Sequence, residues 1–201
     1  LTCAYTGFTD PDGDADSSRF EWSVGGTLAG TGPTLSGGFS YGDTVQCTVT
    51  PSDGTDDGEP KSATVIIVNT PPEILSLELS PSDPVTTTTL NTAVSVTDAE
   101  GDGVSLAYQW TVDGIVVGPG DSSLEPSWFV RDEVVRVMVT PSDTYGVGVA
   151  VTSDPVTIGN TAPGAPGVSI TPGEPVEGED DVLCEVSTAV DVDEDALTYA
   201  I

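Results

Sequence analysis

An acidic loop followed by an aromatic strand occurs three times in this sequence. The stretch TDPDGDADSSRFEW (9–22) returns as TDAEGDGVSLAYQW (97–110) and as VDVDEDALTYAI (190–201). Carboxylates at this spacing can form turns by bonding their own backbone, bind a hard cation such as Ca²⁺, or act as a catalytic acid and base. A feature present in every copy of a repeat favours a structural role over a single active site.

Catalysis has few other candidates in this chain. There is no histidine, which removes the commonest general base and the usual partner of a nucleophilic serine. No glycine-rich stretch has the spacing of a phosphate-binding loop. An EF-hand beginning at Asp10 is excluded too, because Ala15 stands where that loop requires glycine. We expect no enzymatic activity.

Internal repeats define the organisation of the chain. VTPSD occurs at 49–53 and at 139–143, an offset of 90, and Asn-Thr before the linker prolines occurs at 69–70 and at 160–161, an offset of 91. A period near 90 residues is the size of a small β-sandwich module and too long for a solenoid turn.

Within one period the local signals are all β. Alternating or β-branched segments are separated every 8 to 12 residues by Gly, Pro, Asn and Asp, and no segment has a helical period. The clearest strand candidates are 75–80, 92–97, 106–112, 134–140 and 150–158. We predict an all-β chain of tandem immunoglobulin-like antiparallel sandwiches with Greek-key connections, forming an elongated array.

Alignment of the repeats gives three modules. Module one (1–70) begins at LTC, which matches the second strand of the others, so we expect its first strand to be missing. Module two (71–161) is complete. Module three (162–201) holds its first strand, GVSITP (167–172), and its second, VLCEV (182–186), and ends in its third at Tyr199. The chain reads as a window on a longer tandem array. Strand exchange between incomplete ends is the alternative.

Three residues of module one carry a family resemblance. Cys3, Trp22 and Cys47 fall on its expected second, third and sixth strands. With DPDGD (10–14), F-x-W (20–22), GDTVQCTVTPSDG (42–54) and VNTPP (68–72), the chain resembles immunoglobulin-like modules. More closely, it looks like the polycystic-kidney-disease-type and cadherin-like repeats of large bacterial surface proteins.

The resemblance implies a disulfide between Cys3 and Cys47, with Trp22 packed on it. Cys184 matches Cys3, and its expected partner lies outside the chain. Module two has Asn91 and Val137 at these positions and should need no bridge. Buried free thiols in a cytosolic protein are the alternative. Paired core cysteines fit an oxidising compartment better, so we expect a secreted or cell-surface protein.

In this topology the second-to-third and sixth-to-seventh strand loops meet at one end of each sandwich, where the linker also enters. Linker asparagine beside acidic loops is similar to the inter-module calcium sites of cadherin-type arrays. The predicted Ca²⁺ ligands are Asp10, Asp12, Asp14, Asp53, Asn69, Asp98, Glu100, Asp102, Asp143, Asn160, Asp191, Asp193 and Asp195. Asp16, Asp56 and Asp57 lie in the same loops, so module one is the better candidate. The alternative is that these residues only form turns.

Phe20, Trp22, Tyr108 and Trp110 occupy alternating third-strand positions and are expected in the cores. Trp128 has no tryptophan counterpart in module one and is a candidate exposed aromatic. An exposed tryptophan could stack on sugars, whereas core packing or an isolated surface position is the alternative.

The charge of the chain limits its partners. It carries 33 acidic and 4 basic residues, a net charge of −29, which disfavours nucleic acid and anionic membrane surfaces. No apolar run is long enough to insert into a membrane. A salt-adapted source would produce similar acidity.

These observations predict a structural segment of a secreted or cell-surface bacterial protein. We expect a rigid stalk or fibre, stiffened by calcium and by proline-rich linkers, that serves adhesion or surface assembly. Its partners would be neighbouring modules, other copies in a filament, or a surface polysaccharide or protein. The alternative is a carbohydrate-binding accessory module of a secreted hydrolase.

Overall fold

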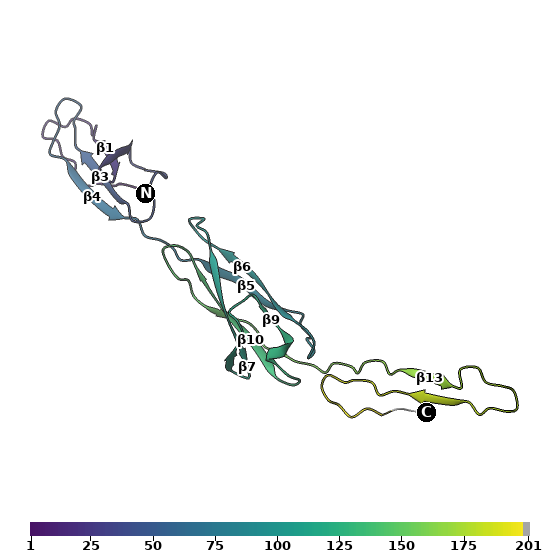
Figure 1. Cartoon of the computed structure of the whole chain (residues 1–201). Helices are drawn as coiled ribbons and strands as arrows, with labels where there is room; N and C mark the ends of the chain where they lie inside the picture. The colour runs from purple at the N-terminus through teal and green to yellow at the C-terminus, as the bar shows by residue number, and fades with distance from the viewer. Residues whose placement is uncertain (199–201) are drawn as a thin grey trace. The chain divides into compact units, whose positions relative to one another are not determined.

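The computed structural model describes residues 1–198 and is all-β, with a single short 3₁₀ turn (Figure 1). The chain divides into two compact units, Leu1–Thr70 and Pro71–Ile201. We keep the names module one (1–70), module two (71–161) and module three (162–201) for the three stretches. No helix within the described range is long and apolar enough to cross a membrane.

Module one is built on a four-stranded antiparallel sheet in the order β2-β1-β3-β4. Its strands are β1 (Arg19–Val24), β2 (Thr27–Thr31), β3 (Thr44–Thr50) and β4 (Lys61–Ile66). Valines and Cys47 alternate with polar residues along β3, so one face of that strand is buried. Trp22, Leu35, Val45, Cys47 and Val49 form the core.

Cys3 and Cys47 form a disulfide across this core, with Cα atoms 6.3 Å apart. The stretch around Cys3, expected to form a strand, pairs only through one isolated bridge between Thr2 and Thr34. The matching strand of module two pairs with a neighbour along nearly its whole length. The start of module one is held by backbone hydrogen bonds from Leu1 and Cys3 to Leu35 and Pro33, and by the disulfide.

Module two contains two antiparallel sheets. One consists of β5 (Glu73–Ser80), β6 (Leu90–Thr97) and β9 (Ser123–Leu124). The other consists of β7 (Ser105–Val112), β8 (Ile115–Val117), β10 (Val134–Ser142), β11 (Val151–Thr152) and β12 (Val156–Thr157). The 3₁₀ turn η1 (Pro126–Trp128) precedes β10.

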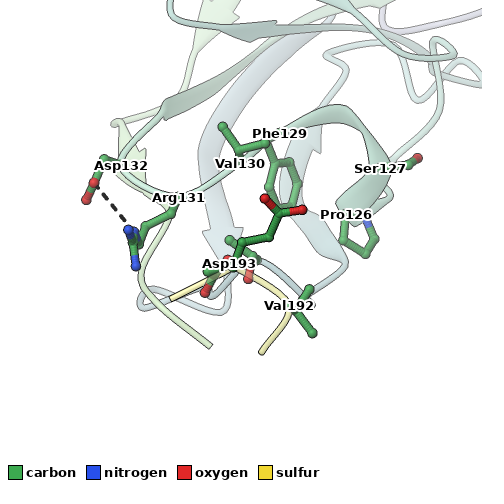
Figure 2. A pocket seen from close by; sticks show the side chains of 10 residues that line it. Pro126, Ser127, Phe129, Val130, Arg131, Asp132, Val192 and Asp193 are labelled. Carbon is green, nitrogen blue, oxygen red and sulfur yellow. Dashed lines mark ion pairs between the residues drawn. The ribbon is translucent and has the colours of Figure 1, made fainter. Parts of the chain in front are cut away.

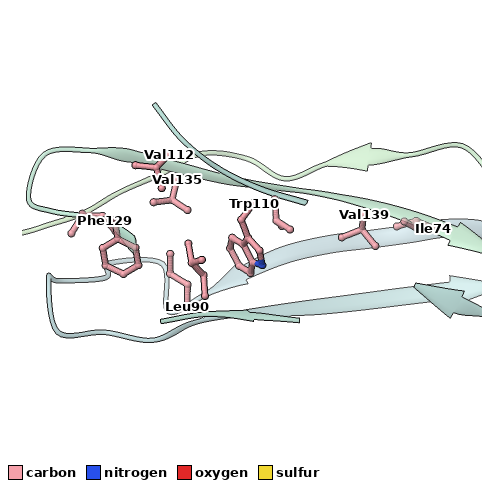
Figure 3. Close-up of a cluster of buried hydrophobic side chains, with 10 residues drawn as sticks. Ile74, Leu90, Trp110, Val112, Phe129, Val135 and Val139 are labelled. Atoms are coloured by element: carbon pink, nitrogen blue, oxygen red, sulfur yellow. The ribbon is translucent and has the colours of Figure 1, made fainter. Parts of the chain in front are cut away.

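The two sheets of module two enclose one apolar core, as in a β-sandwich (Figure 3). Trp110 on β7 is fully buried, and its indole N–H donates to the Asp121 carbonyl at 2.9 Å. Val135, Val137 and Val139 point inward from alternate positions of β10 and are fully buried as well. The period-2 pattern of the sequence thus becomes the inner face of the sheet.

The segment 150–158, which the sequence presents as one strand candidate, forms two short strands. Pro155 has no N–H to donate to a ladder, and the chain breaks between β11 and β12. Ser153 bridges the break, because its N–H donates to the Val137 carbonyl at 2.9 Å and its Oγ accepts the Val137 N–H at 3.2 Å.

Module three is described as far as Thr198. Its strands β13 (Val168–Thr171) and β14 (Leu183–Val186) form an antiparallel hairpin, as predicted for the first two strands. Cys184 on β14 is exposed and is a free thiol. The third strand expected at Tyr199 falls outside the described residues.

Candidate functional site

The first aspartate of each acidic loop organises the loop backbone in the same way. Asp98 Oδ1 accepts the N–H groups of Glu100 at 3.1 Å and Asp102 at 2.8 Å. The matching residue of module three, Asp191, accepts those of Asp193 and Asp195 at 2.9 and 3.1 Å. These are Asx turns, in which a short carboxylate replaces a backbone acceptor.

Module one repeats this geometry. Asp10 Oδ1 accepts the N–H groups of Asp12 at 2.9 Å and Asp14 at 3.1 Å. The turn interpretation therefore holds for the leading aspartate of all three loops. Among the carboxylates that follow, Asp16 accepts the Ser18 N–H at 2.9 Å, whereas Asp193 and Asp195 accept hydrogen bonds from residues of module two.

The sixth-to-seventh strand loops also begin with an aspartate turn. Asp53 Oδ1 accepts the N–H groups of Thr55 at 2.6 Å and Asp56 at 2.7 Å. These two donors lower the pKa of Asp53, because they stabilise the ionised carboxylate. In module two, Asp143 accepts the N–H groups of Tyr145 and Gly146 in the same way.

The two acidic loops of module one lie together, and Arg19 pairs with one of their carboxylates. Asp10, Asp53, Asp56 and Asp57 line a common depression of about 370 Å³. Arg19 pairs with Asp57, which lowers the pKa of that carboxyl through its hydrogen bond and charge. Module one therefore supplies part of its own counter-charge.

The two loops of module two bring four carboxylates close together. The pKa of Asp102 is raised, first by burial and then by the negative charges of Asp98, Asp143 and Glu100. Asp98 Oδ2 is buried and accepts no hydrogen bond within the described part of the chain.

The loop of module three lies against module two and meets an arginine there. Arg131 Nη1 donates to Asp195 Oδ2 at 2.6 Å and to Asn160 Oδ1 at 2.7 Å. Arg131 and Asp193 line a depression of about 610 Å³, together with the apolar side chains of Phe129 and Val192 (Figure 2). The linker asparagine and the acidic loop thus meet, but around a guanidinium.

The loop oxygens are the donor type that Ca²⁺ prefers, and a buried unpaired acceptor such as Asp98 Oδ2 suits a cation. Across residues 1–198, however, no three acidic or cysteine side chains are already arranged to hold a metal ion. Asn69, the remaining predicted ligand, is partly buried at the end of module one. The loops can therefore concentrate negative charge, and a bound metal would require their side chains to move.

Sequence reasoning missed the two arginines that neutralise acidic loops. Arg19 follows its own loop, and Arg131 lies between η1 and β10, where Tyr41 occupies the matching position of module one. The small number of basic residues was the signal that could have identified them. Of the 4 basic residues in the chain, two form ion pairs with these carboxylates.

Trp128, the candidate exposed aromatic, is 45% exposed at the end of η1. Its partner on the protein side is the tight turn at Gly118, where an added Cβ would lie 3.8 Å from the indole ring and 2.7 Å from Leu124. The indole ring therefore lies beside this turn, and nearly half of the residue remains exposed to solvent.

No protein-family model matches the chain, and neither does any curated protein.

Proposed function

We propose that this chain is a structural segment of a secreted or cell-surface protein, built from tandem immunoglobulin-like modules of the polycystic-kidney-disease or cadherin-like type. It acts as a spacer in a stalk or fibre used for adhesion or surface assembly. The observation that carries the proposal is the repeated acidic turn, built with the same hydrogen bonds in all three modules. A turn that is repeated in every module favours a structural role in the tandem array over a role in a single catalytic site.

Two further features support an extracellular spacer. The Cys3–Cys47 disulfide fits an oxidising compartment. Proline-rich linkers follow each Asn-Thr pair of the repeat, at 71–72 and 163–166, and they restrict bending between modules.

Calcium belongs to this proposal at the loops of module two. Asp98, Glu100, Asp102 and Asp143 would hold the ion, since burial and their mutual repulsion already raise the pKa of Asp102 and Asp98 Oδ2 is buried without a hydrogen bond among the described residues. Bound Ca²⁺ would remove this repulsion and stiffen the end of the module where its linker enters. Module one, the better candidate by sequence, ranks second because Arg19 already pairs with Asp57.

The test is thermal unfolding of the whole chain in millimolar Ca²⁺, in Mg²⁺ and in EDTA at fixed ionic strength. Because a ligand stabilises the state that binds it, we expect Ca²⁺ alone to raise the melting temperature. Asp102→Asn should abolish the increase, and Asp154→Asn, in the β11–β12 break, is the matched control. An equal change in melting temperature in Ca²⁺ and Mg²⁺ would indicate that the loop carboxylates only form turns and bind no calcium.

The half-exposed Trp128 favours one second candidate, a carbohydrate-binding accessory module. Retention of the chain on an insoluble polysaccharide, lost in Trp128→Ala but kept in Tyr145→Ala, would support it. Tyr145 is the control because it is a comparably exposed aromatic, at 50%, in another loop of the same module.

A further inference from the structure

One end of module two forms a small polar surface that contacts module three. Arg131 sits at its centre and donates from one nitrogen to Asn160 of the linker and Asp195 of the following loop. Its Nε also lies 3.8 Å from Asp132. The pKa of Arg131 is raised by these carboxylates, Asp195 first, so the guanidinium stays charged.

A second set of contacts holds the same loop beside Arg131. The Thr161 N–H donates to Asp193 Oδ2 at 2.6 Å, and the Thr161 and Thr86 hydroxyls lie 2.7 Å apart. Hydrogen bonds from Thr86 and Thr161 lower the pKa of Asp193. Module two thus offers one cation and two hydroxyl or amide donors to alternate carboxylates of the loop.

The surface formed by Thr86, Arg131 and Thr161 fits the acidic loop both in charge and in the spacing of the carboxylates that it contacts. Asp193 and Asp195 are two residues apart, and the turn made by Asp191 directs both toward module two. Arg131 and Asp195 are 36% and 40% exposed at their side chains, so water and salt reach the pair and weaken it.

We infer that Thr86, Arg131 and Thr161 form a docking surface for the acidic loop of the following module, with the guanidinium in the place expected for a metal ion. This junction is held by an internal cation and requires no divalent one. The inference concerns only the contact between modules two and three, so it stands independently of the stalk proposal. Both the contact and the inference can fail while the protein still serves as a spacer.

The test follows hydrogen exchange of the Thr161 amide by NMR in the full chain, because that N–H is bonded only while the loop is docked. We expect Arg131→Gln to accelerate its exchange several-fold. Arg136→Gln is the matched control: it makes the same change in charge within module two, and Arg136 bonds a carbonyl, that of Ser153, at 3.2 Å. Amides of β10 report in parallel whether module two stays folded.

The effects of salt and of metal removal distinguish a loop held by the Arg131 guanidinium from a loop held by a bound metal ion. In the wild type, raising NaCl toward 1 M should accelerate Thr161 exchange, since screening weakens the ion pair. Replacing Ca²⁺ by EDTA at constant ionic strength should leave it unchanged. Asp195→Asn should reproduce the effect of Arg131→Gln, and the double variant should be no faster than either single one.

Two results would overturn the inference. One is Thr161 exchange in Arg131→Gln equal to that in Arg136→Gln. The other is protection that is lost in EDTA, because a metal and not Arg131 would then hold the loop. The calcium proposal for module two is tested separately, by the melting temperature. The Thr161 exchange experiment can therefore be interpreted even if calcium does not bind module two.

Discussion

Module one and module two build similar cores with different means. Each centres on a buried tryptophan whose indole N–H donates to a carbonyl, from Trp22 to Gly32 at 3.0 Å and from Trp110 to Asp121 at 2.9 Å. The core of module two contains ten buried apolar residues, whereas that of module one contains five, one of which is Cys47 of the disulfide. The comparison indicates that a cross-link compensates for a smaller buried core.

The acidic loops of the two modules differ in a related way. In module one Arg19 neutralises part of the loop charge, whereas in module two burial and the negative charges of Asp98, Asp143 and Glu100 raise the pKa of Asp102. The module with the larger core thus tolerates the more repulsive loop.

Loss of the disulfide should have the largest effect on the stability of module one relative to module two. In the chain-entropy model a bridge across 44 residues contributes about 4 kcal/mol, so reduction should destabilise module one by about that amount. Urea unfolding with and without reductant, followed by hydrogen exchange of β3 and β10, measures both modules. Unfolding of β10 in reductant would contradict the independence of module two from the bridge.

Module two should depend on apolar burial instead. Leu90 is fully buried, and Leu90→Ala should lower the free energy of unfolding of module two by about 3 kcal/mol through lost burial and a residual cavity. Leu75→Ala is the matched control, since Leu75 is 61% exposed in the same sheet. The measurement is the urea midpoint at β10. Equal effects of the two substitutions would show that this core is not the main source of stability.

A shared glycine turn should respond more strongly in module two. Gly58 and Gly148 donate their N–H groups to Pro51 and Pro141 at 2.9 and 2.8 Å. A Cβ on Gly148 would lie 2.0 Å from the Pro72 carbonyl oxygen, whereas on Gly58 the nearest atom is Pro51 Cγ at 3.0 Å.

Gly148→Ala should therefore destabilise module two by about 2 kcal/mol, because backbone must shift, and Gly58→Ala should cost module one less. The shift in urea midpoint of each module measures this difference. Gly103→Ala, where nothing lies within 4 Å of the new Cβ, controls for the general effect of the substitution. A larger cost at Gly58 would reverse the comparison.

The smallest effects should have opposite signs in the two acidic loops. The pKa of Asp57 is lowered, so its ion pair stabilises module one above the ordinary carboxyl pKa and this stability is lost as pH falls through the lowered value. The pKa of Asp102 is raised, so its contribution to module two is present at low pH and is lost as pH rises through the raised value.

In EDTA at neutral pH, Asp57→Asn should thus lower the melting temperature of module one, and Asp102→Asn should raise that of module two slightly. Differential scanning calorimetry from pH 3 to 7, with hydrogen exchange to assign each transition, gives both signs. Shifts in the same direction would show that the two loops carry equivalent charge environments.

Much of the fold was predictable because it follows from short-range pattern. The period-2 alternation in 134–140 became β10, with Val135, Val137 and Val139 inside, and Trp22 and Trp110 lie in the cores as expected. The sequence prediction treated 150–158 as one strand and missed the break at Pro155, although proline signals such a break. In the structure the Ser153 side chain accepts the Val137 N–H beside that break. The stretch around Cys3 forms only one isolated bridge, from Thr2 to Thr34, whereas β6 at the matching position of module two pairs with β5 along nearly its whole length.

The sequence by itself determined that the chain is all-β and that its acidic turns repeat, since both depend on residue type and period, and the family resemblance implied the Cys3–Cys47 bridge. Only the tertiary structure decided which carboxylates meet a cation. Arg131 lies 64 residues from Asp195, and Arg19 lies 38 residues from Asp57. Ion pairs depend on distance in space, which strand pairing and turn geometry fix and which spacing along the chain does not reveal.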